Sequence, residues 1–162
     1  MVKLYDRDAA LSYAKEWALR RNPRYYDFSD IGGDCTNFIS QCIYAGSGVM
    51  NFAPEVGWYY TSANHRSASW TGVNFLYRFL VTNTKKGPYA KEVAQPGLLI
   101  PGDIIQFGND IKGWHHSLFV IQTGDTYDKV LIATHTYDAY GRQLSSYDFT
   151  KIRFLHIAGV YA

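Results

Sequence analysis

Long apolar stretches are missing from this sequence. No uninterrupted apolar run approaches the roughly 20 residues that a membrane-spanning helix needs. A secretory signal peptide is not visible either, because the opening MVKLYDRDAA becomes charged within its first residues. The sequence therefore predicts a domain without a membrane span. Either it is a domain taken from a longer protein, or its export uses another route.

Cysteine is scarce, with Cys35 and Cys42 as the only two. A disulfide-stapled scaffold uses more cysteines in a smaller chain, and the count excludes a zinc site made of four cysteines. If both cysteines lie on one helix, their spacing separates them by about 10 Å along the helix axis. That separation is too large for a disulfide, so the sequence offers two independent thiols.

Charge is also sparse and nearly balanced. Charged residues make up 19% of the chain, and the formal net charge is +2. The only basic doublets lie at 20–21 and 85–86, whereas nucleic-acid binding needs basic residues gathered on one face. We therefore expect no nucleic-acid partner.

Apolar and aromatic residues are abundant by comparison. Apolar residues account for 47% of the 162 positions, which is enough for the core of a single domain spanning residues 1–162. Aromatic residues reach 17%, with 14 Tyr and 4 Trp. Aromatic side chains serve either a core or a groove for sugars and extended polymers, and the sequence leaves both uses open.

Helical periodicity dominates the first half of the chain. Asp6 or Asp8 can cap the first helix, and Asn22-Pro23 is expected to end it. Gly46 and Gly48 are expected to stop the second helix. The predicted helices span residues 7–21, 35–45 and 71–82.

Short β-prone runs, separated by turn signals, dominate the second half. Residues 49–70 form a predicted long loop, and residues 85–95 are polar and loop-like. Helices followed by strands predict an α+β fold, with N-terminal helices packed on a C-terminal antiparallel sheet. The predicted strands span residues 103–108, 116–123, 129–136 and 152–161, with a turn at 138–141.

Cys35 is the first candidate for chemistry, because it follows a Gly32-Gly33 turn and opens the second predicted helix. Free N–H groups and the helix dipole stabilise a thiolate at such a position, and the same N–H groups can hold an oxyanion. The alternative is a buried structural cysteine, which is also our interpretation of Cys42.

A nucleophilic cysteine needs a base, and His116 opens a predicted strand after a polar turn. His135 lies near the polar end of another predicted strand. Neighbouring antiparallel strands can place the two side by side, so that His135 orients the His116 ring.

Other chemistries have weaker patterns. His65, His135 and one of the adjacent pair His115-His116 can supply imidazoles for zinc, but successive residues on a strand point to opposite faces. No HExxH or GxSxG motif occurs. A pair of carboxylates for glycoside hydrolysis has no distinguishing context among the 14 acidic residues. We expect no metal and no other cofactor.

Several ordered segments resemble one family. The segment GGDCTNFISQCIYAG at 32–46 is similar to the signature of the bacterial putative amidase domain family, which belongs with the NlpC-type and CHAP cysteine peptidases in the papain-like superfamily. The likeness extends over nearly the whole chain, through the opening helix, GWYYT, SWTGVNFLYRFL, PGDIIQF, WHHSLFVI and ATHTYD. The resemblance implies a papain-like fold and a cysteine hydrolase.

The same resemblance implies site residues. It makes Cys35 the nucleophile, His116 the base and His135 the orienting residue, while His115 stands where the family often has Asp. An upstream polar side chain often completes the oxyanion hole in the superfamily, a role open here to Tyr25 or Tyr26. Asp34 is expected to cap the helix that begins at Cys35.

The implied activity is acyl transfer to water, with cleavage of an amide in peptidoglycan or in a similar peptide-like substrate. Trp58, Tyr59 and Trp70 are candidates for lining the substrate groove, with packing in the core as the equal alternative. We expect a monomer that acts outside the cell or in the cell wall as an exported domain. The competing hypotheses are a non-catalytic module that binds cell-wall glycans, and a deamidase or toxin that acts on protein side chains.

Overall fold

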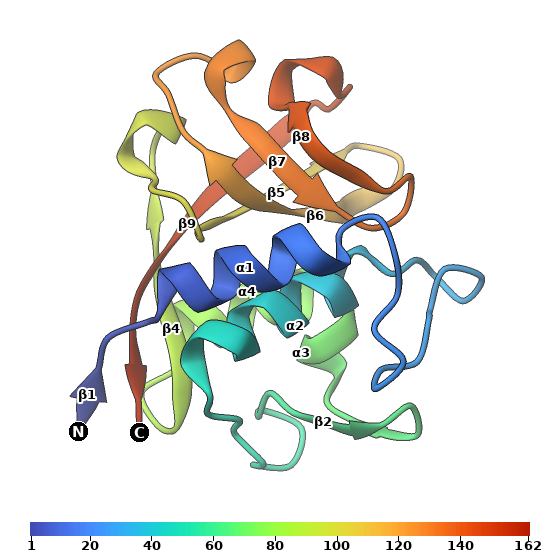
Figure 1. Cartoon of the computed structure of the whole chain (residues 1–162). Helices are drawn as coiled ribbons and strands as arrows, with labels where there is room; N and C mark the ends of the chain where they lie inside the picture. The colour runs from blue at the N-terminus through green and yellow to red at the C-terminus, as the bar shows by residue number, and fades with distance from the viewer.

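The computed structural model describes residues 1–162 (Figure 1). All four helices precede the long strands of the sheet, as expected, although three short strands lie before or between the helices. The predicted α+β class is confirmed. The helices are α1 (Arg7–Trp17), α2 (Cys35–Ser47), α3 (Ala68–Thr71) and α4 (Val73–Thr82). None of them combines the length and apolar character that crossing a bilayer requires.

The main sheet has seven strands, and every pairing in it is antiparallel. Its longest strand, β9, pairs with β1, β4 and β5, and the sheet continues from β5 through β6 and β7 to β8. A separate hairpin pairs β2 with β3. The bounds are β1 (Val2–Lys3), β2 (Tyr60–Ser62), β3 (His65–Arg66), β4 (Gly87–Val93), β5 (Ile104–Asn109), β6 (Gly113–Gln122), β7 (Leu131–Thr134), β8 (Ala139–Gln143) and β9 (Lys151–Tyr161).

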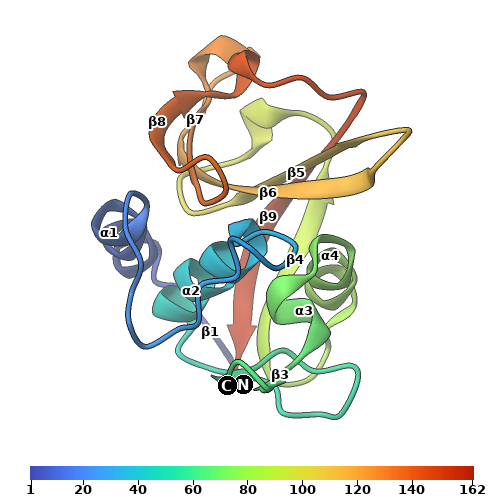
Figure 2. The same ribbon diagram turned by 90° about the vertical axis from the view of Figure 1, so that its right-hand side faces the viewer.

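Both faces of the central strands are buried, which explains why apolar residues occupy successive positions in them instead of alternating with exposed polar ones. Ile104 and Phe119 belong to the core between sheet and helices, whereas Ile105 and Leu118 belong to a second core on the opposite face. The second core is covered by irregular chain (Figure 2). This covering chain includes the 3-10 turns η1 (Pro96–Leu98), η2 (Tyr127–Lys129) and η3 (Leu144–Ser146).

Helix α1 begins as predicted and ends early. The Asp6 side chain accepts a hydrogen bond from the N–H of Ala9, so Asp6 is the N-cap. The helix stops at Trp17, four residues before the predicted end. The physical reason is long-range: His135 bonds the carbonyl of Trp17, and Arg21 turns away to bond Asp138.

Helix α2 lies at the centre of the molecule and is buried on almost every side. Gly48 ends it in the left-handed conformation, as expected of a helix C-cap. Gly46 lies inside the helix and does not stop it. A Cβ at this position would approach the Tyr5 ring to 2.5 Å. The glycine therefore permits the chain before α1 to pack directly on α2.

Two predicted loops and one predicted turn contain regular structure. Residues 87–93, within the predicted polar loop, pair with β9 along their whole length as β4. The turn predicted at 138–141 belongs mostly to β8, which pairs with β7 at the sheet edge. The long loop at 49–70 holds β2, β3 and most of α3. These segments are short or polar because they lie at edges, so they lack the apolar pattern of central strands.

Candidate active site

A cavity of about 420 Å³ lies at the N-terminus of α2. Cys35 and His116 line it together, although they come from α2 and β6 and are far apart in the sequence. The structure thus brings together the two residues that were predicted as nucleophile and base. The cavity is lined by Gly32, Gly33, Cys35, Phe107, Lys112, His115, His116, Thr136, Tyr137, Tyr147 and Asp148.

Cys35 is the first residue of α2 and is 7% exposed. Its Sγ lies 3.8 Å from Oγ1 of Thr36, and that hydroxyl lies 3.0 Å from Oγ of Ser117 on β6. These contacts fix the start of the helix against the strand that carries His116. Burial raises the pKa of the Cys35 thiol, and hydrogen bonds from the Ser117 backbone and from Thr36 offset only part of this effect.

His116 is 8% exposed and packs between the rings of Phe107 and Tyr147, with ring centroids 5.0 and 5.8 Å away. Burial lowers the pKa of His116 to about 4, and the charges of His115 and Arg142 act in the same direction. The imidazole is therefore neutral in the free protein at neutral pH. Together with the raised pKa of Cys35, this argues against a preformed thiolate–imidazolium pair, contrary to the expectation from the helix N-terminus alone.

The depressed pKa of His116 predicts a specific loss of stability in acid. The ordinary pKa of 6.5 applies to the unfolded chain, so between about pH 6.5 and about pH 4 the unfolded state binds a proton that the folded state does not. The stabilising contribution is complete above this window and is lost as the pH falls through it. We expect acidification from about pH 7 to about pH 4 to lower the unfolding free energy of the wild type by roughly 3 kcal/mol more than that of His116→Gln. Denaturant titrations at both pH values measure this difference, and parallel losses in the two proteins would refute it.

His135 does not contact His116, which corrects the prediction that it orients the base. Its Nδ1 lies 2.5 Å from Oδ2 of Asp34, and its Nε2 lies 2.8 Å from the carbonyl oxygen of Trp17. The ring also stacks on Phe38, with centroids 4.1 Å apart. His135 thus faces the helices, because successive residues of an extended chain point to opposite sides. Both ring nitrogens therefore lie against oxygen atoms of the protein and are not available to the cavity.

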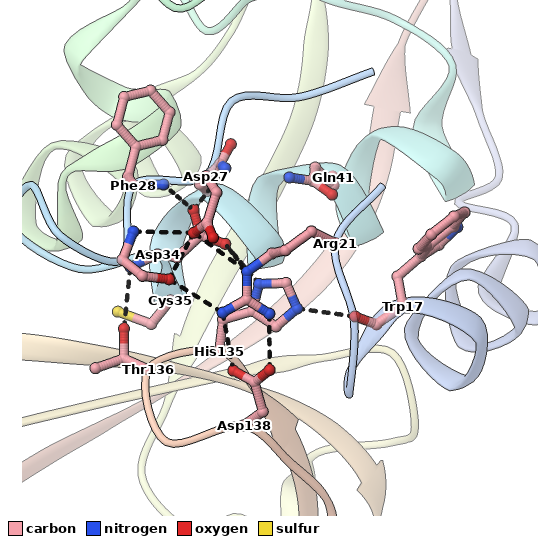
Figure 3. A network of polar contacts seen from close by, with 12 residues as sticks. Trp17, Arg21, Asp27, Phe28, Asp34, Cys35, Gln41, His135, Thr136 and Asp138 are labelled. Carbon is pink, nitrogen blue, oxygen red and sulfur yellow. Dashed lines mark hydrogen bonds and ion pairs between the residues drawn. The ribbon is translucent and has the colours of Figure 1, made fainter. Parts of the chain in front are cut away.

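Asp34 is the centre of a buried polar network (Figure 3). Besides His135, its carboxylate accepts hydrogen bonds from the N–H of Phe28 at 2.8 Å and from Nδ2 of Asn37 at 2.9 Å. Arg21 Nε lies 3.5 Å from the same carboxylate. Asp34 occupies the expected N-cap position of α2, but its side chain forms no capping hydrogen bond with the helix backbone. The carboxylate binds the partners named above instead.

The residue before Cys35 is therefore attached to two distant segments. Arg21, which follows α1, forms two hydrogen bonds to Asp138 at 2.7 and 3.1 Å. The N–H of Asp34 donates to Oγ1 of Thr136 at 3.0 Å. Figure 3 shows this network enclosing the start of α2 beside Cys35. The turn between β7 and β8 and the end of α1 thus hold the backbone that presents the thiol.

The aromatic residues predicted to line a substrate groove are in the core. Trp58 and Trp70 are both 0% exposed, and their rings lie 4.7 Å apart. Their indole N–H groups donate to Ser40 Oγ and Asn37 Oδ1 on α2. The groove assignment is wrong for both, because the long loop folds inward and anchors itself on α2.

The tyrosines named with them also lie away from the cavity. Tyr25, the candidate oxyanion donor, packs on the rings of Tyr60 and Trp70 and does not line the cavity. Tyr59 contacts the rings of Phe52 and His65. Neither position supports a role at Cys35.

Tyr137 and Tyr147 are among the cavity residues that were not predicted. Tyr137 is 87% exposed and has a positive φ of 60°, as does the preceding Thr136 at 64°. Tyr147 contacts the His116 ring, and its buried hydroxyl has no hydrogen-bond partner. The sequence signals near Tyr137 were the ATHTYD segment, which contains it, and the turn indicated by Asp138 and Gly141. None pointed to Tyr147.

The remaining histidines have separate surroundings. His115 lines the cavity with its Nε2 3.4 Å from Nδ2 of Asn109, and burial followed by the charge of Lys112 lowers its pKa. His65 contacts Thr61 in the β2–β3 hairpin, and His156 bonds the buried Asp103. The imidazoles considered for zinc do not converge, and no group of three His, Cys, Asp or Glu side chains is placed to hold a metal ion.

Comparison with known proteins shows the family of the chain. The family model described as "Putative amidase domain" matches residues 4–158, so the chain belongs to this family. The description indicates a hydrolase that acts on amides.

Among curated proteins, the chain is similar to the "Uncharacterized protein YhbB" of Bacillus subtilis strain 168. The two are 34% identical over 161 residues, which cover 94% of this chain and 50% of that protein. The chain thus spans about half the length of the relative. No solved structure shows a significant similarity to this chain.

Proposed function

We propose that this chain is a cysteine hydrolase that cleaves an amide bond of bacterial peptidoglycan, with Cys35 as nucleophile and His116 as base. The observation that carries the proposal is that both side chains line one cavity at the N-terminus of the buried helix α2. A helix-opening cysteine opposite a histidine on an antiparallel strand also supports the placement in the papain-like superfamily with the NlpC-type and CHAP peptidases.

The proposed reaction is acyl transfer through a thioester. His116 accepts the proton of the Cys35 thiol while Sγ attacks the amide carbonyl carbon. The backbone N–H groups of the first turn of α2 lack partners within the helix and can hold the developing oxyanion. His116 then protonates the leaving amine, and water, deprotonated by the same imidazole, hydrolyses the thioester and restores the thiol.

Proton transfer and attack are coupled in this mechanism. The pKa of Cys35 is raised by burial and that of His116 is lowered to about 4, so the neutral pair is the resting state. The thiolate forms only as the substrate carbonyl arrives. A base that stays neutral in mild acid keeps the acidic limb of the pH profile of kcat/KM below the ordinary histidine range.

Tyr137 replaces the two tryptophans as the proposed aromatic contact for substrate. It is exposed at the cavity, and its backbone has the left-handed conformation, which is unfavourable for tyrosine. Strain of this kind persists where the surrounding structure imposes it and is common at ligand sites. Here the Thr136 side chain, bonded to the N–H of Asp34, holds the turn.

Replacing Tyr137 with asparagine is expected to separate binding from stability. Asparagine tolerates the left-handed region, so the unfolding free energy should rise by up to about 1 kcal/mol. Loss of the aromatic contact should raise KM several-fold. Tyr140→Asn is the matched control, since Tyr140 is also exposed but does not line the cavity, and its KM should not change. An unchanged KM for Tyr137→Asn would remove Tyr137 from the substrate site.

The substrate is tested by digesting purified peptidoglycan and identifying the products by mass spectrometry. Release of intact stem peptides from glycan indicates an amidase, and cleavage within the peptides indicates an endopeptidase. Conversion of protein glutamine or asparagine side chains, with peptidoglycan untouched, would support a deamidase with the same catalytic residues instead. We further propose that residues 1–162 form one domain, that the protein is a monomer, and that it acts in the cell wall or outside the cell.

A further inference from the structure

The His116 ring has one hydrogen-bonding neighbour among the side chains. Its Nε2 lies 3.4 Å from Oγ1 of Thr134, a residue that is 0% exposed on the neighbouring strand β7. Thr134 shares a face of the sheet with His116, whereas the next residue, His135, faces the helices. The polar side chain beside the proposed base is therefore a hydroxyl.

Counting hydrogens determines the direction of this contact. The Thr134 hydroxyl has one hydrogen, and Oγ1 lies 3.0 Å from the carbonyl oxygen of Ser117 and 3.0 Å from that of His135. Carbonyl oxygens only accept, and both lie closer to Oγ1 than Nε2 of His116 does, so the geometry favours donation of the hydroxyl hydrogen to one of them. In that arrangement a lone pair of Oγ1 faces His116, and Nε2 of His116 carries the hydrogen in the contact.

We infer that Thr134 is a positioning residue that holds His116 in the Nε2–H tautomer and leaves Nδ1 bare to accept the Cys35 proton. The inference rests on the proposed function, because it assigns His116 as the base. Nδ1 has no protein partner, and the ring borders the cavity that Cys35 also lines. In the other tautomer, Nδ1 would carry a hydrogen and could not take one from the thiol.

No other polar side chain is bonded to the ring. Both nitrogens of His135 are engaged elsewhere, His115 contacts Asn109, and the Tyr147 hydroxyl has no partner. Thr134 also differs from a carboxylate in this position, because it orients the ring without a negative charge. The separation of 3.4 Å is long for a hydrogen bond, and such contacts commonly tighten when substrate binds.

The test compares Thr134→Val, which keeps the shape and removes the hydroxyl, with Thr134→Ser, which restores it. We expect Thr134→Val to lower kcat by about tenfold or more at little change in KM, and Thr134→Ser to recover most of it. Thr123→Val is the matched control, because it removes a threonine hydroxyl that bonds the carbonyl of Pro96 away from the cavity. Its kcat should equal that of the wild type.

The tautomer itself is measured by nitrogen-15 NMR of the wild-type His116 ring, which needs neither catalysis nor a folded valine variant. A protonated Nε2 and a bare Nδ1 are expected, with a mixed population in Thr134→Val. A protonated Nδ1 in the wild type, or full kcat in Thr134→Val, would overturn the inference. Neither result would disprove the proposed function, which fails instead if activity survives the loss of Cys35.

Discussion

Replacing Cys35 with alanine is expected to reduce amide hydrolysis by at least about 10³-fold, because no other group can form the thioester. The thiol is at the edge of a cavity and makes one weak side-chain contact, to Thr36. The fold should therefore survive, and the unfolding free energy should change by less than about 1 kcal/mol. Initial rates on peptidoglycan and denaturant unfolding curves measure the two quantities.

Cys42→Ala is the matched control for this change. Cys42 is on the same helix, is 0% exposed and belongs to the core rather than to the cavity. Its replacement should leave kcat near the wild-type value and lower the unfolding free energy by about 1–2 kcal/mol through a small cavity. Hydrolysis that persists in Cys35→Ala and disappears in Cys42→Ala would reverse the assignment of the nucleophile.

Replacing Asp34 with alanine is expected to lower the unfolding free energy by about 3–5 kcal/mol, the largest stability effect that we predict. The change removes the carboxylate that pairs with His135 and Arg21, and it leaves the N–H of Phe28 without its acceptor. Buried polar groups left without their hydrogen-bond partners in the core cost far more than a lost contact at the surface. Activity should fall as well, because the start of α2 loses its attachment.

Asp30→Ala provides the comparison for Asp34. Asp30 is exposed, lies in the same connector before α2 and forms no ion pair. Its replacement should change the unfolding free energy by no more than about 0.5 kcal/mol. If Asp34→Ala proved equally mild, the buried network could not be what holds the nucleophile in place.

The parts of the site that depend on short-range structure could be predicted from local sequence patterns. A Gly-Gly turn followed by a helix places Cys35 at a helix N-terminus wherever that helix packs. His116 could be predicted because a polar turn and an apolar strand flank it. The strand β4 could not, because its polar residues take a sheet position only through pairing with β9.

The third position of the site depended on strand phase. His135 was predicted beside His116, yet it is Thr134 that shares the face of the base. One residue decides the face in a strand, since neighbouring side chains alternate. Local sequence patterns predict neither which face of the strand each residue takes nor that Asp34 pairs with His135, about a hundred positions away.

The aromatic residues illustrate a different limit. Trp58 and Trp70 lie in a stretch with no clear periodicity, so the sequence left a substrate groove and the core as equal alternatives for them. Their indole N–H groups find partners on α2, so both rings can be fully buried without an unsatisfied donor. Exposure of Tyr137 arises from a strained turn, which composition does not reveal.

The measurement that tests the central claim most directly is the activity that remains as Cys35 is progressively alkylated with iodoacetamide, with the modified site mapped by mass spectrometry. We expect hydrolysis to fall in proportion to the modified fraction of Cys35 and to reach zero while Cys42, 0% exposed, stays unmodified. The alkylation rate should still be rising above about pH 8.5, the ordinary thiol range, because burial raises the pKa of Cys35. Full hydrolysis by protein whose Cys35 is completely alkylated would contradict the assignment of Cys35 as the nucleophile.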